Sequence, residues 1–87
     1  MPRLRYTVKQ HRRALGNVLR SLRKQARLSQ QDVAIAANMD RSYLCEIEAG
    51  KHDPGSYKIA ALAAIYGSTF AEVATRVEAC AVKRPKR

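Results

Sequence analysis

Apolar residues recur at α-helical spacing along this chain, and no segment has the alternating pattern of a credible β-strand. One stripe follows the positions i, i+3, i+4, i+7 and i+11, at Leu15, Val18, Leu19, Leu22 and Ala26. The same spacing returns near the end of the chain, at Phe70, Val73, Ala74, Val77 and Ala81. Such stripes mark the face of a helix that packs against a core. The sequence therefore predicts an all-α fold.

Capping residues divide the middle of the chain into short helices. Ser29, with Asp32 three residues later, has the pattern of a capping box and predicts a helix over 30–37. Asn38 tolerates the left-handed conformation that often ends a helix. A second short helix is expected over 41–49. Two short helices with about three residues between them have the spacing of a helix-turn-helix motif.

Two more helices are expected beyond a polar turn at 50–55. Ser56 is the expected cap of the first, and Gly67 follows its end. Thr69 and Glu72 have the spacing of another capping box, which opens the last helix. With the long helix before Ser29, the total is five helices.

The length of 87 residues indicates a single domain. We expect a basic arm at 1–8, a helical domain at 9–82 and a basic tail at 83–87. No apolar run approaches the roughly 20 residues that span a bilayer, and the N-terminus does not have the pattern of a signal peptide. A cytoplasmic location is expected.

The net charge of +10 is unevenly distributed. The first 31 residues hold nine Lys and Arg and no acidic residue, whereas 32–78 hold seven acidic and four basic residues. Lys and Arg that contact phosphates release counterions, which favours binding to nucleic acid. We therefore expect nucleic acid as the partner in preference to a membrane surface. The remaining explanation of the positive charge is that it only makes the protein more soluble.

Residues that serve catalysis or metal binding are not grouped in the sequence. Cys45 and Cys80 lack the spacing of metal ligands, and His11 and His52 lie apart in polar segments where solvated side chains are expected. Neither a nucleophile–base pair nor a glycine-rich phosphate loop is evident. We expect no enzymatic activity, no metal and no cofactor, and we expect both thiols to be reduced.

Several short motifs occur in a specific order. They are LR at 22–23, LSQQDVA at 28–34, EIEAGK at 46–51 and Pro54. Together they make about residues 15–74 resemble the Cro/C1-type helix-turn-helix family, also called the XRE family. The resemblance implies a five-helix, lambda-repressor-like DNA-binding domain. Asn38 stands where the family usually has Gly, and Asn adopts the same backbone conformation.

The resemblance makes 41–49 the recognition helix, the second helix of the motif, which lies in the DNA major groove. Leu44 and Ile47 would anchor it to the core. The residues expected to face the bases are Arg41, Ser42, Cys45 and Glu46. Arg41 can donate two hydrogen bonds to guanine, worth about 1–3 kcal/mol of discrimination. Alternatives remain open: a solvent-facing Arg41, a capping Ser42, or a Glu46 that pairs with a nearby Lys or Arg.

Residues around the motif are expected to contact DNA phosphates. They are Gln30, Tyr43, Lys51, Ser29 and Lys58. The resemblance implies that Gln30 also braces the recognition helix, and Ser29 is more a cap than a contact. Tyr43 either directs its hydroxyl to a phosphate or packs at the core edge. The run NMDRSYL also resembles controller proteins of restriction–modification systems, in which the matching tyrosine lies near the DNA backbone.

Two further sets of residues have structural roles. The resemblance implies a partly buried salt bridge between Arg23 and Glu48. A dimer interface is expected on the last helix, and its members are Phe70, Val73, Val77 and Cys80. The alternative for this helix is packing on the first helix within the chain.

These features predict a sequence-specific regulator that binds double-stranded DNA. We expect a bacterial homodimeric repressor or autoregulator with a pseudo-palindromic operator. The alternative is an antitoxin-type module that binds a protein partner as well as its own operator. The basic arms either follow phosphates or serve as solubilising tails.

Overall fold

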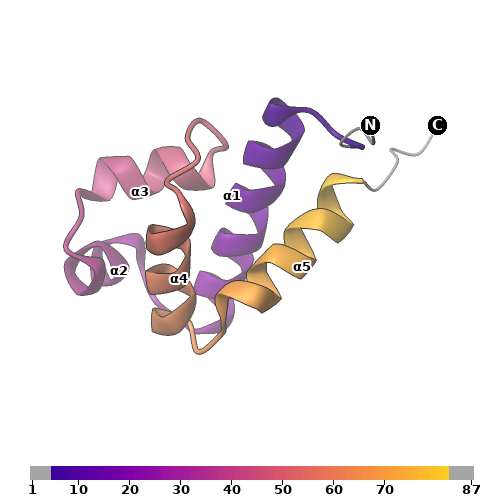
Figure 1. Ribbon diagram of the computed structural model, residues 1–87. Helices are drawn as coiled ribbons and strands as arrows, with labels where there is room; N and C mark the ends of the chain where they lie inside the picture. Colours follow the sequence, from indigo (N-terminus) through magenta and orange to yellow (C-terminus); the bar gives the residue numbers. More distant parts are fainter. Residues whose placement is uncertain (1–4, 83–87) are drawn as a thin grey trace.

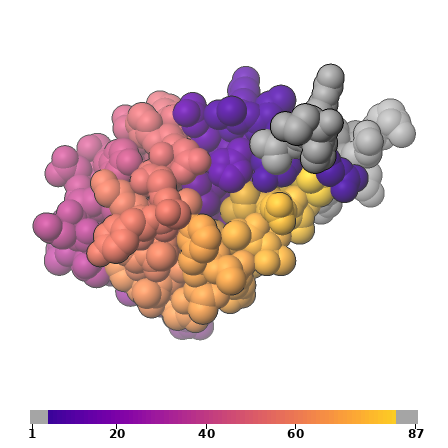
Figure 2. All heavy atoms as spheres, in the orientation of Figure 1, coloured from indigo at the N-terminus to yellow at the C-terminus, as the bar shows by residue number. Residues whose placement is uncertain are grey.

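The computed structural model describes residues 5–82 and contains five α-helices and no β-strand in that range. They are α1 (Val8–Gln25), α2 (Gln30–Ala37), α3 (Arg41–Glu48), α4 (Ser56–Ile65) and α5 (Phe70–Ala81). Figure 1 shows α1 and α5 side by side and running in opposite directions. Figure 2 shows α2 and α3 together at one end of the molecule. The predicted all-α, five-helix fold is confirmed.

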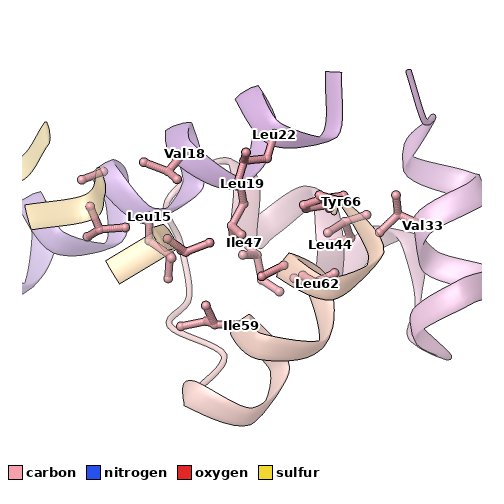
Figure 3. Close-up of a cluster of buried hydrophobic side chains, with 14 of the residues drawn as sticks. Leu15, Val18, Leu19, Leu22, Val33, Leu44, Ile47, Ile59, Leu62 and Tyr66 are labelled. Carbon is pink, nitrogen blue, oxygen red and sulfur yellow. The ribbon is translucent and has the colours of Figure 1, made fainter. Parts of the chain in front are cut away.

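A single apolar core joins the helices (Figure 3). Its largest fully buried side chains come from every helix: Leu15, Leu19, Val33, Leu44, Ile47, Leu62 and Val73. In α3, Leu44 and Ile47 are both fully buried, so the apolar side of this short helix is fixed to the core. The remaining side of α3 is left to face outward.

Local hydrogen bonds define where the helices begin. The Ser29 hydroxyl accepts from the Asp32 N–H at 3.0 Å, and the Asp32 carboxylate accepts from the Ser29 N–H at 3.2 Å. This is the capping box that the sequence predicts for α2. A second box, between Thr7 and Gln10, begins α1 at Val8. Helix α1 therefore includes Val8, the last residue of the expected arm at 1–8.

Other helix ends differ from expectation. Gly55, with φ of 90°, is the N-cap of α4, and Ser56 is already the first helical residue. Only half of the box expected for α5 forms: the Thr69 hydroxyl accepts from the Glu72 N–H, whereas the Glu72 carboxylate accepts from the Ser68 hydroxyl. Short-range patterns thus locate these helices correctly but misassign individual caps.

The expected dimer stripe on α5 needs correction. Val73 and Val77 are only 1% and 3% exposed, because α5 packs along α1 within the chain. These two valines therefore pack within the chain, as the alternative expectation held. Of the expected interface residues, Phe70 and Cys80 are exposed. The helical period identifies the stripe, but it does not tell which neighbour covers it.

A glycine in the middle of α1 marks the closest approach of two helices. A Cβ on Gly16 would lie 2.6 Å from the Glu48 carbonyl oxygen and 2.7 Å from the Ile47 carbonyl oxygen. Both atoms belong to backbone that cannot rotate away. Since Gly inside a helix costs about 1 kcal/mol relative to Ala, its presence here is explained by the contact with α3.

We expect Gly16→Ala to destabilise the protein, because α1 and α3 must separate to admit the methyl group. The gain in helix propensity offsets part of the loss, so a net decrease of about 1–2 kcal/mol in the free energy of unfolding is expected. Urea denaturation measures it. Asn17→Ala, at an exposed neighbouring position, is the control and should not lower stability. A Gly16→Ala protein as stable as the wild type would contradict this packing.

Candidate nucleic-acid interface

The outward side of α3 carries polar side chains. Arg41, Ser42 and Cys45 are exposed, and Glu46 is half-buried. Arg41 is the single Lys or Arg of this helix, so the surface differs from a general basic patch. These four side chains are the base contacts expected from the sequence. The helix therefore presents hydrogen-bonding groups of different kinds along one side.

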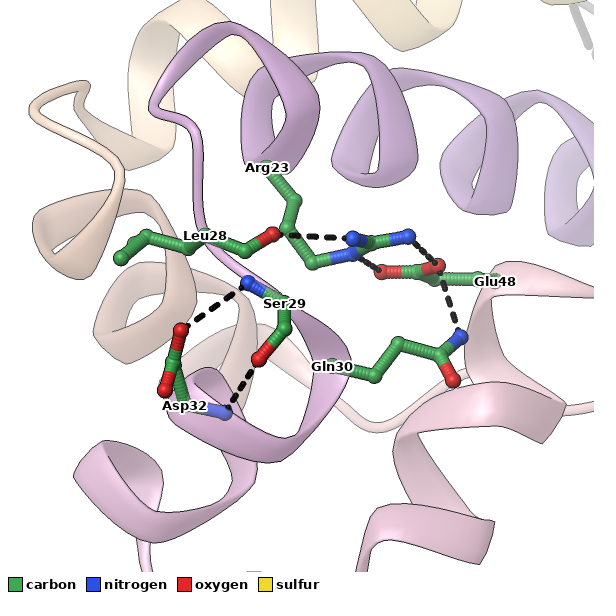
Figure 4. A network of polar contacts seen from close by, with 6 residues as sticks. All are labelled: Arg23, Leu28, Ser29, Gln30, Asp32 and Glu48. Atoms are coloured by element: carbon green, nitrogen blue, oxygen red, sulfur yellow. Dashed lines mark hydrogen bonds and ion pairs between the residues drawn. The ribbon is translucent and has the colours of Figure 1, made fainter.

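A buried ion pair fixes the C-terminal end of α3 (Figure 4). Arg23 donates through Nε to Glu48 Oε2 at 2.7 Å and through Nη2 to Oε1 at 3.0 Å. Its Nη1 donates to the Leu28 carbonyl at 3.0 Å. The hydrogen bond with Glu48 raises the pKa of Arg23, against the opposing effect of burial. Arg23 thus connects α1, α3 and the segment that leads into α2.

Gln30 joins this network from the first turn of α2. Its Nε2 donates to Glu48 Oε1 at 3.1 Å. The carboxylate of Glu48 therefore accepts hydrogen bonds from side chains of both α1 and α2. This bond fixes the two helices of the motif relative to each other. The family resemblance implies that Gln30 braces the recognition helix, and the bond to Glu48 has that geometry.

The buried hydroxyl of Tyr66 lies near the same pair. Burial raises the pKa of Tyr66, and the negative charge of Glu48 raises it further. Its hydroxyl has no hydrogen-bond partner within residues 5–82. The phenol is therefore kept neutral and acts here as a bulky, mostly apolar side chain beside the ion pair.

A second cluster lies at the middle of α3. His52 Nε2 is 2.9 Å from Glu46 Oε1, and the His52 ring lies 5.6 Å from the Tyr43 ring. The ammonium group of Lys58 lies over the same ring, 5.0 Å from its centroid. The cluster joins α3, the following turn and α4. Glu46 has a partner, as one alternative held, but that partner is His52 in place of Lys or Arg.

The two histidines reach solvent, as the sequence suggests, but each also contacts other side chains. His52 contacts Glu46, and His11 lies 3.4 Å from Asp53 and stacks on Tyr6. Both contacts span turns or distant segments. The helical period carries no signal for such pairs, so the sequence does not predict them.

The remaining expected contact residues lie on α3 or on the segments before and after it. Lys51 and Lys58 are exposed, and Tyr43 is half-buried at the edge of the core. The Ser29 hydroxyl is engaged in the capping box, which agrees with its expected role as a cap. Together with Arg41, the two lysines supply positive charge along the exposed edge of the motif.

The described residues carry neither a metal-binding cluster nor a membrane-spanning helix. Within residues 5–82, no three His, Cys, Asp or Glu side chains gather where they would hold a metal ion. None of the helices in that range has the length and apolar character that crossing a bilayer requires. Cys45 and Cys80 are both free and exposed.

We expect Arg23→Met to lower the free energy of unfolding by about 3–5 kcal/mol, because it strands the buried Glu48 carboxylate. The double variant Arg23→Met/Glu48→Met should recover much of this loss, since it removes both charges. Thermal or urea denaturation measures each effect. Arg76→Ala is the matched control, because Arg76 and Glu72 form a 3.9 Å pair near solvent, which contributes less than about 1 kcal/mol. Equal losses for Arg23→Met and Arg76→Ala would contradict the structural role of the buried pair.

Comparisons with known proteins agree with this geometry. The model of the family described as "Helix-turn-helix domain" matches residues 14–79. A crystal structure of the clp gene regulator ClgR from Corynebacterium glutamicum superposes with a TM-score of 0.78 at 28% identity, over 82% of this chain and 76% of that chain. A second ClgR structure from C. glutamicum gives a TM-score of 0.76 at 28% identity, over 80% of this chain and 90% of that one. No curated protein sequence matches the chain. The chain therefore belongs to the helix-turn-helix domain family of DNA-binding transcriptional regulators.

Proposed function

We propose that this protein is a sequence-specific regulator that binds double-stranded DNA with α3 in the major groove. The observation that carries the proposal is the division of α3 into two sides. Leu44 and Ile47 are fully buried, whereas Arg41 and Ser42 are exposed at its N-terminal end. In helix-turn-helix complexes, the N-terminal residues of the second helix contact base edges. The exposed end of α3 has the side chains for that task.

The proposed base contacts are Arg41, Ser42, Cys45 and Glu46. Arg41 would donate to O6 and N7 of guanine, the commonest specific contact in the major groove. Ser42 donates or accepts, and Cys45 offers a small, weakly polar surface. Glu46 would accept from a cytosine amino group through the oxygen that His52 leaves free. This mixture suits recognition of sequence better than general attraction to phosphates.

The proposed phosphate contacts surround the base-reading side. They are Gln30, Tyr43, Lys51, Lys58 and, more weakly, Ser29. Lys51 and Lys58 are exposed beyond the C-terminal end of α3 and at the start of α4. Gln30 is held by Glu48, so its position is fixed before any DNA arrives. Such contacts orient the protein on the duplex without reading its sequence.

We propose that the regulator acts as a homodimeric repressor or autoregulator on a pseudo-palindromic operator. A two-fold dimer would place two α3 helices on half-sites about one helical turn apart. The exposed Phe70 supports a protein contact on α5, because it is 42% exposed beside an apolar groove of about 430 Å³. Residues of α1, α4 and α5 line this groove, among them Leu15, Ile59 and Val77. With Val73 and Val77 buried, the proposed interface is reduced to Phe70 and Cys80.

We expect Arg41→Ala and Lys51→Ala to weaken DNA binding in different ways. Arg41→Ala should cost about 1–3 kcal/mol on the preferred site and relax the preference at one base pair. Lys51→Ala should weaken binding to specific and random duplexes alike and reduce the salt dependence by about one phosphate contact. Fluorescence anisotropy with both duplexes, at several salt concentrations, separates the two effects. If Arg41→Ala weakened binding to both duplexes equally, a direct contact of Arg41 with a specific base would be excluded.

A further inference from the structure

The cluster around Tyr43 carries an inference about how the DNA-facing charges are positioned. Tyr43 is half-buried and packs against the apolar core, so its ring has a fixed place at the edge of α3. The Lys58 ammonium lies 5.0 Å from the centre of that ring, and the His52 ring lies 5.6 Å from it at an angle of 36°. His52 in turn contacts Glu46 at 2.9 Å. One aromatic ring of α3 thus adjoins side chains from the turn and from α4.

The physical reason for this arrangement is electrostatic. The face of an aromatic ring is negative, and it attracts a Lys ammonium within about 6 Å of the centroid. Lys58 is exposed and has a long, flexible side chain. A free lysine loses much of its rotamer freedom when it contacts a phosphate, whereas a lysine already held against a ring loses less. The ring therefore lowers the entropy that Lys58 would lose on contact with an anion.

We propose that Tyr43 is a positioning residue whose ring, and not its hydroxyl, holds Lys58 ready for a DNA phosphate. The proposal rests on the function proposed above and adds to it a role for the aromatic face. It also replaces the direct phosphate contact proposed above for Tyr43 with an indirect role through Lys58. A tyrosine whose hydroxyl bonds a phosphate needs that oxygen, whereas a tyrosine that holds a lysine needs only the ring. Phe and Leu substitutions separate these roles.

The test compares Tyr43→Phe with Tyr43→Leu. Phe keeps the ring and removes the hydroxyl; Leu keeps apolar bulk against the core and removes the ring. We expect Tyr43→Leu to bind DNA about two- to fivefold more weakly than Tyr43→Phe, which is the range for an exposed cation–π contact. Anisotropy titrations with one selected duplex measure this ratio. If Tyr43→Phe loses as much affinity as Tyr43→Leu, the hydroxyl is the contact and the proposal is wrong.

A double-mutant cycle with Lys58→Ala identifies the partner of the ring. Lys58 is exposed, so its substitution leaves the core intact. If the ring acts through Lys58, Tyr43→Leu should reduce affinity in the wild-type background and have little further effect when Lys58 is already Ala. Additive losses would show that Tyr43 acts independently of Lys58 and would overturn the proposal.

A measurement without DNA separates this proposal from the proposed function. Protons beside the Lys58 ammonium lie over an aromatic ring, so their NMR signals should be shifted upfield by the ring current. The shift should be present in the wild type and in Tyr43→Phe and lost in Tyr43→Leu. Tyr57→Leu is the control: Tyr57 is 84% exposed, and its removal should leave the Lys58 signals in place.

The NMR measurement and the DNA titration together distinguish a failure of the positioning role from a failure of the proposed function. Unshifted Lys58 signals in a protein that binds DNA would overturn the positioning role and leave the proposed function intact. Shifted signals in a protein that binds no duplex would overturn the proposed function, and with it the use of Lys58 on a phosphate, while the contact between ring and lysine would stand. The NMR spectrum of each variant also reports whether it is folded.

Discussion

The buried pair between Arg23 and Glu48 holds the helix-turn-helix part of this molecule together. Glu48 is the last residue of α3 and accepts hydrogen bonds from Arg23 of α1 and Gln30 of α2. Three helices therefore meet at one carboxylate. An isolated carboxylate in this place would be costly, and the hydrogen bonds that satisfy it require a defined geometry. The pair thus fixes the orientation of α3 more than it adds to overall stability.

Close packing also fixes the position of α3. Gly16 lets α1 approach the end of α3 until a Cβ would overlap with backbone atoms. Leu44 and Ile47 bury the inner side of α3 in the core. An eight-residue helix is too short to be stable alone, so it depends on these tertiary contacts. Its outer side is then free to carry polar residues that contribute little to folding.

The distribution of charge agrees with this division of roles. Helix α1 holds many of the basic residues and no acidic ones, whereas α3 holds Arg41 as its single Lys or Arg. Helix α1 thus supplies much of the positive charge that attracts a polyanion. In the proposed function, the side chains of α3 are left to distinguish one DNA sequence from another.

Local patterns made much of the fold predictable. The capping box of Ser29 and Asp32 marks the start of α2, and Asn38, with φ of 54°, forms the left-handed turn that its residue type allows. The family resemblance supplied the Arg23–Glu48 pair, which no periodicity reveals. The contact of His52 with Glu46 was missed because it spans a turn. Val73 and Val77 pack on α1 and not on a second copy, which the sequence could not show, because an apolar stripe on a helix does not indicate which element covers it.

The claim that α3 reads DNA sequence is tested most directly by selecting bound duplexes from a random pool with the purified protein. The proposed function predicts enrichment of one site with two related half-sites about one helical turn apart. It also predicts a G·C pair in each half-site at which the preference is lost in the Arg41→Ala protein. A pool that stays random after repeated selection, or an enriched site that Arg41→Ala selects unchanged, would contradict the account.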